Sequence, residues 1–465
     1  MEENIKPKRK KRYEIDMVNG NLFIKIIRFS IPLALMGILQ LLYNTADLIV
    51  VGNFSGDSEA LGAVGSTGSL INLFINLFMG LSVGTNVVCA RLFGANEKNR
   101  VGKVVHTSIL MSFLIGIVLG ILGFLFCKEL LLLMNNDLEL SRVYLRIYFV
   151  GMPFNLCYNF AAAVLRAVGD TKRPLYFLTI SGFVNVLLNL LFVIVFRLSV
   201  AGVAMATVIS QFLSFLMIIV TLIKTNECYK LKLKELKISL NELKQIIKIG
   251  LPAGIQSSIF SISNVLIQSS VNMFGTVAMN GNTAAQSIEG FVYTSMNSVY
   301  HASLAFTGQN YGARNVKNIK KVTLYSLIIV TMFALIIGQP LFWFGRSVIS
   351  LYTKVPVEIE VAYIRLHYLT LPYFLCGIMD VMVGILRGIG YSVMPMIVSI
   401  VGVCGFRVAW ILGFFYQYSS FQDVTDLNML YVSYPISWTI TFLVHFVTYL
   451  VVSKKVFRQL TTIER

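Results

Sequence analysis

The chain has 465 residues, of which 56% are hydrophobic and only 13% are charged. A soluble domain has roughly 25% charged residues, so most of this chain is not folded against water. The formal net charge is +17, but the basic residues lie in short connectors and no aromatic-rich basic module accompanies them, which argues against nucleic acid and favours a membrane surface as the partner.

Apolar runs predict twelve transmembrane helices. A run of about 20 apolar residues spans the hydrocarbon core as a helix, and residues 104–126 and 322–344 reach that length without an internal charge. The basic N-terminal segment resembles the start of a signal peptide, but residues 26–52 are longer than a signal core, so we interpret them as the first span. The predicted spans begin near Ile26, Ala60, Val104, Val143, Pro174, Val200, Ile246, Thr283, Val322, Val361, Val393 and Asn428.

The distribution of lysine and arginine predicts the orientation of these spans. If the N-terminus is cytoplasmic, alternate connectors face the cytoplasm and hold about 31 of the 39 basic residues. This bias predicts a multi-pass protein of the plasma membrane with both termini in the cytoplasm. The basic connectors are the N-terminal segment, residues 91–103, 166–173, 224–244, 309–321 and 387–392, and the tail from Lys454.

Four motifs recur in the same order at offsets of about 220 residues. Each repeat holds six predicted spans, so both repeats enter the membrane from the same side and are related by a pseudo-two-fold axis along the membrane normal. The fold class is therefore an all-α polytopic membrane protein with two six-helix bundles. A cleft is expected between the bundles, and rocking of two bundles about such a cleft is typical of an alternating-access transporter. The pairs are IIRFSIP (26–32) with IIKIGLP (246–252), RLFGAN (91–96) with QNYGAR (309–314), YLRIYFVGMP (144–153) with YIRLHYLTLP (363–372), and VLRAVGDTKRP (164–174) with ILRGIGYSVMP (385–395).

The repeat and the basic connectors predict a division of the chain into five parts. These are residues 1–20, a basic cytoplasmic segment; 21–223, the N-terminal six-helix lobe; 224–245, a cytoplasmic linker; 246–453, the C-terminal six-helix lobe; and 454–465, a cytoplasmic tail.

Polar side chains of three predicted spans fall at a similar depth in the first repeat. Placing an ionisable group inside a span costs a few kcal/mol. A functional or structural role is therefore expected for Asp47, which lies five residues before Gly52. Asn185 and Asn189 are four residues apart and share a helix face, and Thr207 lies about 10 Å into the sixth span. Together they offer only oxygen acceptors for an ion, which suits a hard cation, or a proton held on the carboxylate.

A hydrogen-bonded tie between helices is the alternative role for these four residues. The second repeat has no acid near Gln268, opposite Asp47, and has Phe406 and Trp410 near the places of the two asparagines. An architectural tie would be expected in both repeats, so the asymmetry favours one coupling-cation site. Tyr43, one turn before Asp47, either interacts with it or faces other helices.

Several further polar positions are candidates for a substrate cleft. Gln40 lies on the same polar stripe of the first span as Asp47. In the second repeat, Glu289 and Arg407 lie at similar depth and are candidates for an ion pair with each other. The alternative is that Glu289 or Asp380 binds a cationic substrate. The full set of cleft candidates is Gln40, Gln256, Asn264, Glu289, Met296, Asp380 and Arg407. For Gln256, Asn264 and Met296, contact with neighbouring helices is an equally good alternative.

The first-span sequence IPLALMGILQLLYNTADLIVVG, the GAN and GAR turns and the LRAVGD and LRGIGY turns together resemble the multidrug and toxic compound extrusion (MATE) transporters over residues 20–455. The resemblance implies a V-shaped pair of bundles that exchange Na⁺ or H⁺ for lipophilic, often cationic, molecules. It also implies that Asp47, Asn185, Asn189 and Thr207 bind the coupling cation. Asn189 stands where some members have aspartate, which leaves Na⁺ and H⁺ open. We expect no cofactor and a monomer.

Two other functions compete with export. A flippase for lipid-linked precursors of the same superfamily needs a strongly cationic cleft, for which only Arg407 and Arg365 are candidates. An intramembrane enzyme needs a nucleophile and a base at one depth, which Asp47 and its amide neighbours do not provide. The six cysteines and four histidines also lack metal-site spacing. Secondary transport is therefore the predicted function, and the chain is not expected to be an enzyme.

Overall fold

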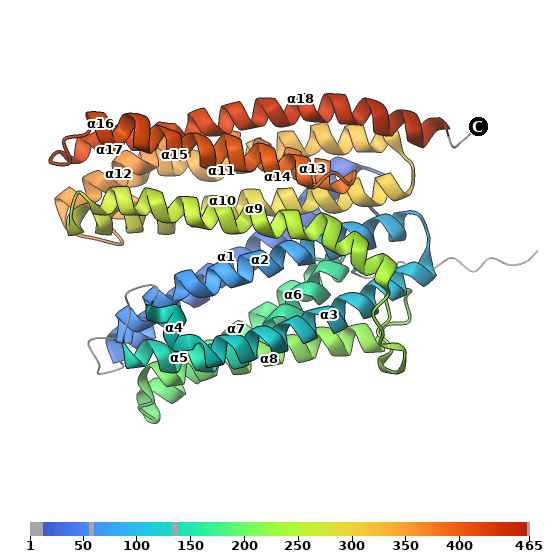
Figure 1. Cartoon of the computed structure of the whole chain (residues 1–465), viewed down its shortest axis with the longest axis horizontal. Coiled ribbons are helices and arrows are strands. Elements are labelled where there is room, and N and C mark those ends of the chain that lie inside the picture. Colours follow the sequence, from blue (N-terminus) through green and yellow to red (C-terminus); the bar gives the residue numbers. More distant parts are fainter. Residues whose placement is uncertain (1–12, 55–59, 133–137, 463–465) are drawn as a thin grey trace, which may run out of the picture.

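The computed structural model describes residues 13–54, 60–132 and 138–462, and within these ranges the chain is helical with no β-strand (Figure 1). The α-helices are α1 (Leu22–Phe54), α2 (Ala60–Gly94), α3 (Lys98–Leu125), α4 (Cys127–Leu132), α5 (Glu139–Val150), α6 (Met152–Ala167), α7 (Lys172–Leu190), α8 (Ser199–Lys224), α9 (Leu240–Asn272), α10 (Thr276–Gly312), α11 (Val316–Ile349), α12 (Pro356–Thr370), α13 (Tyr373–Gly388), α14 (Val393–Ser399), α15 (Phe406–Trp410), α16 (Tyr416–Tyr418), α17 (Leu427–Tyr431) and α18 (Ser433–Thr462). Short π or 3₁₀ segments are η1 (Leu191–Val195), η2 (Leu233–Glu235), η3 (Ile400–Gly405), η4 (Ile411–Phe415) and η5 (Val424–Asp426).

Across the described residues these helices make twelve passages, in agreement with the sequence prediction. Nine are long and apolar enough to cross a membrane by themselves, and the bent pairs α5–α6 and α12–α13 raise the number to eleven. The remaining passage is α10, whose 37 residues include many amides and hydroxyls. Every predicted start lies at or up to seven residues after the observed helix start, because the first turns of the helices are polar and extend beyond the apolar run. The observed linker is correspondingly shorter, since α9 begins at Leu240.

The two bent passages are equivalent in the repeat. α5 meets α6 at an angle of 49°, and α12 meets α13 at 51°. Pro153 lies in the first turn of α6 and Pro372 directly precedes α13. Because proline has no N–H to donate and its ring clashes with the preceding turn, a bend at both places follows from the sequence.

Helices α1–α8 form one bundle and α9–α18 a second, drawn in blue to green and in yellow to red in Figure 1. In the first bundle α3 packs on α6 and α7 on α8, and in the second α10 packs on α11 and α13. The bundles meet mainly where α2 lies against α9 and α1 against α10. We call the end of the molecule formed by residues 95–97, 168–171 and 225–239 the basic end.

Glycines allow the backbones of α2 and α9 to touch near the basic end. A Cβ added to Gly80 would lie 2.0 Å from the backbone nitrogen of Gly254, and one added to Gly84 would lie 2.3 Å from the carbonyl oxygen of Ile246. A Cβ on Gly250 would lie 2.6 Å from the Cα of Leu81. Small residues are what permits such approach between helices in a membrane. The bundles are therefore closed against each other on this side.

Reciprocal hydrogen bonds reinforce this closure, and they come from the repeated motifs. Arg91, the first residue of RLFGAN, donates to the carbonyl oxygen of Gly388 at 3.0 and 3.1 Å. Gln309, the first residue of QNYGAR, donates to the carbonyl oxygen of Ala167 at 2.7 Å. Ala167 and Gly388 occupy the same place in the LRAVGD and LRGIGY motifs. Each bundle thus binds the corresponding turn of the other.

Replacing Gly254 by valine is expected to separate the bundles at the basic end. Overpacking of this kind costs about 1–3 kcal/mol, enough to shift a two-state equilibrium roughly 5- to 150-fold. Spin labels would be attached to cysteines that replace the exposed residues Lys98 and Lys317, in a background without other accessible cysteines. The distance between the two labels should be longer in Gly254→Val than in the same background with Gly254. Gly65→Val on α2 is the matched control, because a Cβ at Gly65 meets nothing within 4 Å. An unchanged distance distribution in Gly254→Val would contradict the close-contact interface.

Candidate functional site

The structure brings together the four polar residues that the sequence placed at one depth of the first repeat. Asp47 comes from α1, Asn185 and Asn189 from α7, and Thr207 from α8. The Nδ2 of Asn189 donates to the Asp47 carboxylate and lies 3.4 Å from the Oδ1 of Asn185. The Nδ2 of Asn185 lies 3.5 Å from the Oγ1 of Thr207, whose hydroxyl also interacts with Asp47. The packing of α1 on α7 and of α7 on α8 creates this cluster.

One oxygen atom in the cluster lacks a hydrogen bond within the described part of the chain. Asn189 is fully buried, and its Oδ1 has no partner among these residues. Leaving a buried acceptor unsatisfied costs about 1–3 kcal/mol. The Asp47 carboxylate beside it is partly buried. A carboxylate, two amide oxygens and a hydroxyl form a donor set that fits a small hard cation or a proton on the carboxylate.

Tyr43 does not hydrogen-bond to Asp47. Its ring lies against Gly182, where an added Cβ would be 1.9 Å from a ring carbon, and its hydroxyl donates to the carbonyl oxygen of Thr179 at 3.3 Å. Of the two roles considered from the sequence, packing against another helix is therefore the one observed. The ring holds α1 and α7 together one turn from the carboxylate.

Two tyrosines of α5, which the sequence pattern did not single out, lie close to this cluster. Tyr144 and Tyr148 both interact electrostatically with Asp47. The Nε2 of Gln211 lies 3.5 Å from the Tyr148 hydroxyl. Gln211 was detectable, because it follows Thr207 by four residues and so shares its helix face. The tyrosines gave no signal, since aromatic residues are equally common in helix packing.

Gln40, the cleft candidate of the first bundle, is exposed on α1. On the adjacent face of α1, a Cβ on Gly37 would lie 2.1 Å from the Cγ2 of Thr294 on α10. The polar stripe of α1 therefore runs beside the contact between the two bundles.

In the second bundle Glu289 pairs with Arg365 and not with Arg407. The carboxylate oxygens of Glu289 accept from the Nε and Nη2 of Arg365 at 2.7 and 2.9 Å. The Nη1 of Arg365 donates to the Oδ1 of Asn282 at 2.8 Å, which also accepts from the Tyr431 hydroxyl. The predicted pairing of Arg407 with Glu289 is therefore wrong. The depth of a residue along its span does not show which helix faces it, and here Arg365 of α12 faces Glu289 of α10.

A cavity of about 300 Å³ lies in the second bundle beside this ion pair. Four of the predicted cleft residues line it: Asn264, Glu289, Asp380 and Arg407. Gln256 and Met296 do not line it. Gln256 accepts a hydrogen bond from Arg387 at 2.8 Å, and buried Met296 packs against Gly377. These two are part of the helix packing, and their assignment to the cavity wall is corrected.

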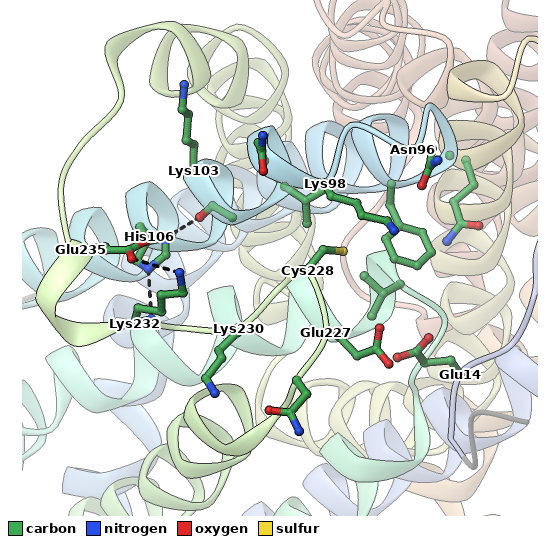
Figure 2. Close-up of a pocket in the computed structure, with 18 of the residues that line it drawn as sticks. Glu14, Asn96, Lys98, Lys103, His106, Glu227, Cys228, Lys230, Lys232 and Glu235 are labelled. Atoms are coloured by element: carbon green, nitrogen blue, oxygen red, sulfur yellow. Dashed lines mark hydrogen bonds and ion pairs between the residues drawn. The ribbon is translucent and has the colours of Figure 1, made fainter. Parts of the chain in front are cut away.

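A larger cavity of about 1750 Å³ lies at the basic end, between the α8–α9 linker and the first bundle. Figure 2 shows Lys98, Lys103 and Lys230 around it, with Glu14 and Glu227. Both lysines and acidic residues line this cavity, as is typical of solvent-exposed connectors between helices. It lies at the closed side of the bundle contact and contains none of the predicted site residues.

Two helical bundles, each with a polar cluster in its interior, fit a polytopic membrane protein, and the proteins that this chain resembles are transporters rather than enzymes. The MatE family model matches residues 32–191 and 252–411, one match in each repeat, and the chain belongs to this family.

The chain resembles relatives over most of its length. It is 28% identical to "Probable multidrug resistance protein YoeA" of Bacillus subtilis, covering 92% of this chain and 93% of that protein. It is 24% identical to "Probable multidrug resistance protein NorM" of Thermotoga maritima, covering 84% and 86%. Among solved structures, the "Outward-facing conformation of a multidrug resistance MATE family transporter of the MOP superfamily" has a TM-score of 0.88 at 24% identity, covering 98% of this chain and all of that one.

Arg365→Met is expected to lower the stability of the purified protein by about 3–5 kcal/mol, because it leaves the Glu289 carboxylate buried without a partner. The double variant Glu289→Gln/Arg365→Met should recover part of that loss, as measured by thermal unfolding in detergent. Arg346→Met is the control, since its pair with Glu360 is 60% and 44% exposed and contributes at most about 1 kcal/mol. Equal losses of stability in Arg365→Met and Arg346→Met would show that the buried ion pair stabilises the protein no more than the exposed one.

Proposed function

We propose that the chain exports small amphipathic molecules, often cationic, in exchange for a cation that binds among Asp47, Asn185, Asn189 and Thr207. The observation that carries this proposal is the unsatisfied, buried Oδ1 of Asn189 beside the Asp47 carboxylate. The names of the relatives, which describe multidrug resistance, support small-molecule export. The coupling cation, Na⁺ or H⁺, is a substrate of the cycle.

We infer that the basic end faces the cytoplasm of the cell that holds the protein in its plasma membrane. Lysine and arginine concentrate in the connectors of that end, as expected for cytoplasmic loops. The contacts of α2 with α9 then close the cytoplasmic side, and we infer an arrangement of the bundles that faces outward. The fold similarity to a transporter in an outward-facing conformation supports this inference.

Cation binding changes which arrangement of the bundles is favoured. The Asn189 amide directs its Nδ2 to Asp47, and its Oδ1 has no hydrogen-bond partner among the described residues. An incoming Na⁺ would be met by both oxygens once that amide rotates, whereas a proton would remove the charge from Asp47. Either event alters the contacts between α1 and α7. A ligand shifts a conformational equilibrium only by its different affinity for the two states, and this rearrangement supplies the difference.

The alternative flippase function receives less support than export. It needs a cationic cleft for a pyrophosphate group, and of the two candidate arginines, Arg365 is neutralised by Glu289. Among the described residues that line that cavity, only Arg407 remains available.

Asp47→Asn is expected to reduce cation-driven transport about tenfold or more, because the amide cannot supply the negative charge that an ion or proton requires. Uptake of a cationic dye into inverted membrane vesicles would be measured with a sodium gradient and, separately, with a proton gradient. The gradient that drives wild-type transport identifies the ion.

Glu360→Gln is the matched control, because its carboxylate is exposed and far from the cluster in sequence and fold, so transport should stay at the wild-type rate. Undiminished coupled transport by Asp47→Asn would remove this residue from the mechanism.

The proposed orientation predicts opposite labelling of two exposed positions. A cysteine at Lys234 in the linker should react with an impermeant maleimide only in inverted vesicles, and one at Gln422 only in intact cells. Both would be introduced into a background without the native cysteines. Reaction of both positions from one side would contradict the predicted topology.

A further inference from the structure

A short segment ahead of α1 crosses from the first bundle to the second at the basic end. We call residues 13–20 the N-terminal strap; none of them is helical, and they lead through Asn21 into α1. Met17, in the middle of the strap, is 0% exposed and belongs to a hydrophobic cluster whose other members come from α1 and from the second bundle. Complete burial of this apolar side chain stabilises the attached position of the strap.

Two asparagines of the second bundle bind the backbone of the strap. The Nδ2 of Asn310, on α10, donates to the carbonyl oxygen of Met17 at 2.9 Å. The Nδ2 of Asn318, on α11, donates to the carbonyl oxygen of Val18 at 2.6 Å. Because both acceptors are backbone oxygens, these contacts depend on the path of the strap.

The first bundle holds the same strap at the turn between α6 and α7. The backbone N–H of Ile15 donates to the carbonyl oxygen of Gly169 at 3.1 Å. The φ of Gly169 is +96°, and a Cβ added there would lie 2.4 Å from the carbonyl oxygen of Ile15, so only glycine permits this close approach. Asn310 and Gly169 are near neighbours in sequence of Gln309 and Ala167, which join the bundles directly. The strap therefore crosses the junction of the two bundles.

The segment ahead of α9, the repeat counterpart of α1, makes an equivalent connection. The N–H of Ser239 donates to the Oγ1 of Thr107 on α3, and Glu242 at the start of α9 accepts from Arg100 on α3, both at 2.9 Å. Arg100 and Asn318 occupy the same place in the repeat. Each repeat thus extends the segment before its first helix onto the third passage of the other. The linker is covalently joined to both bundles, whereas the strap reaches the second bundle through non-covalent contacts, which are reversible.

We propose that the N-terminal strap is a latch, which holds the bundles closed at the basic end and must leave Asn310 and Asn318 before they separate there. The inference rests on the proposed function, which requires this end to open during transport. The strap atoms bonded to Gly169 and Asn310 belong to Ile15 and Met17, and an extended chain advances at most about 3.6 Å per residue. The strap therefore does not stay attached to both turns once the bundles move apart.

Distances between spin labels test the latch in the purified full-length protein, without an ion gradient or a substrate. The labels would be attached to cysteines that replace exposed Lys224, at the end of α8, and exposed Lys321, on α11, in a background without other accessible cysteines. Asn318→Ala removes one hydrogen bond to the strap, and Met17→Ala removes its buried side chain. The ratio of long to short distances should rise about threefold or more in Asn318→Ala and about tenfold or more in Met17→Ala.

A control and a double variant show whether these effects arise from the strap. Asn99→Ala is the matched control, because Asn99 is an exposed asparagine of the same end, on α3, and its distances should equal those of the background. In Met17→Ala/Asn318→Ala, the second substitution should add less than it does alone, because the strap has already been released.

An unchanged ratio in both single variants, or effects that add fully in the double variant, would overturn the latch. If Met17→Ala does not fold, an unchanged ratio in Asn318→Ala alone overturns it, since that side chain is only partly buried. These outcomes are distinct from failure of the proposed function. The distances do not involve Asp47, so the latch can fail while transport depends on that residue, and it can hold while transport does not.

Discussion

The reciprocal contacts between the two bundles at the basic end are the constraint on which the architecture depends. Arg91 and Gln309 occupy the same place in the repeat, and each donates to a backbone carbonyl in the other bundle. Glycines let the backbones of α2 and α10 approach each other here: a Cβ added to Gly312 would lie 1.9 Å from the carbonyl oxygen of Arg91, and one added to Gly94 would lie 2.0 Å from that of Gln309. Next to this region, α2 and α9 form the most extensive contact between any two helices of the described chain, so the bundles are firmly closed at this end.

The repeats are alike in their contacts and unlike in their buried charges. The first bundle holds a carboxylate among amides, and the second holds a closed ion pair with a separate acid and arginine. The shared framework of contacts follows the sequence repeat, whereas the buried charges do not. Each charged cluster includes a helix that contacts the other bundle, α1 in the first bundle and α10 in the second.

The sequence predicted the helices and the depth of polar groups better than it predicted their neighbours. Apolar runs located all twelve passages, and the four-residue spacing of Asn185 and Asn189 placed both beside Asp47. Depth follows from counting residues, but a partner also depends on how each helix is rotated about its axis. That rotation decides that Glu289 meets Arg365 rather than Arg407, that Tyr43 turns to Gly182, and that Gln256 and Met296 are enclosed. It is set by packing against several helices at once.

The polarity of α10 has a consequence for how the protein is made. This helix carries Asn282 and Glu289 on buried faces and is not apolar enough to count as a span by itself. In lipid alone, these groups would lack the partners that Arg365 and Tyr431 supply. Both partners are synthesised later in the chain. We therefore expect stable insertion of α10 to depend on the later synthesis of α12 and α17.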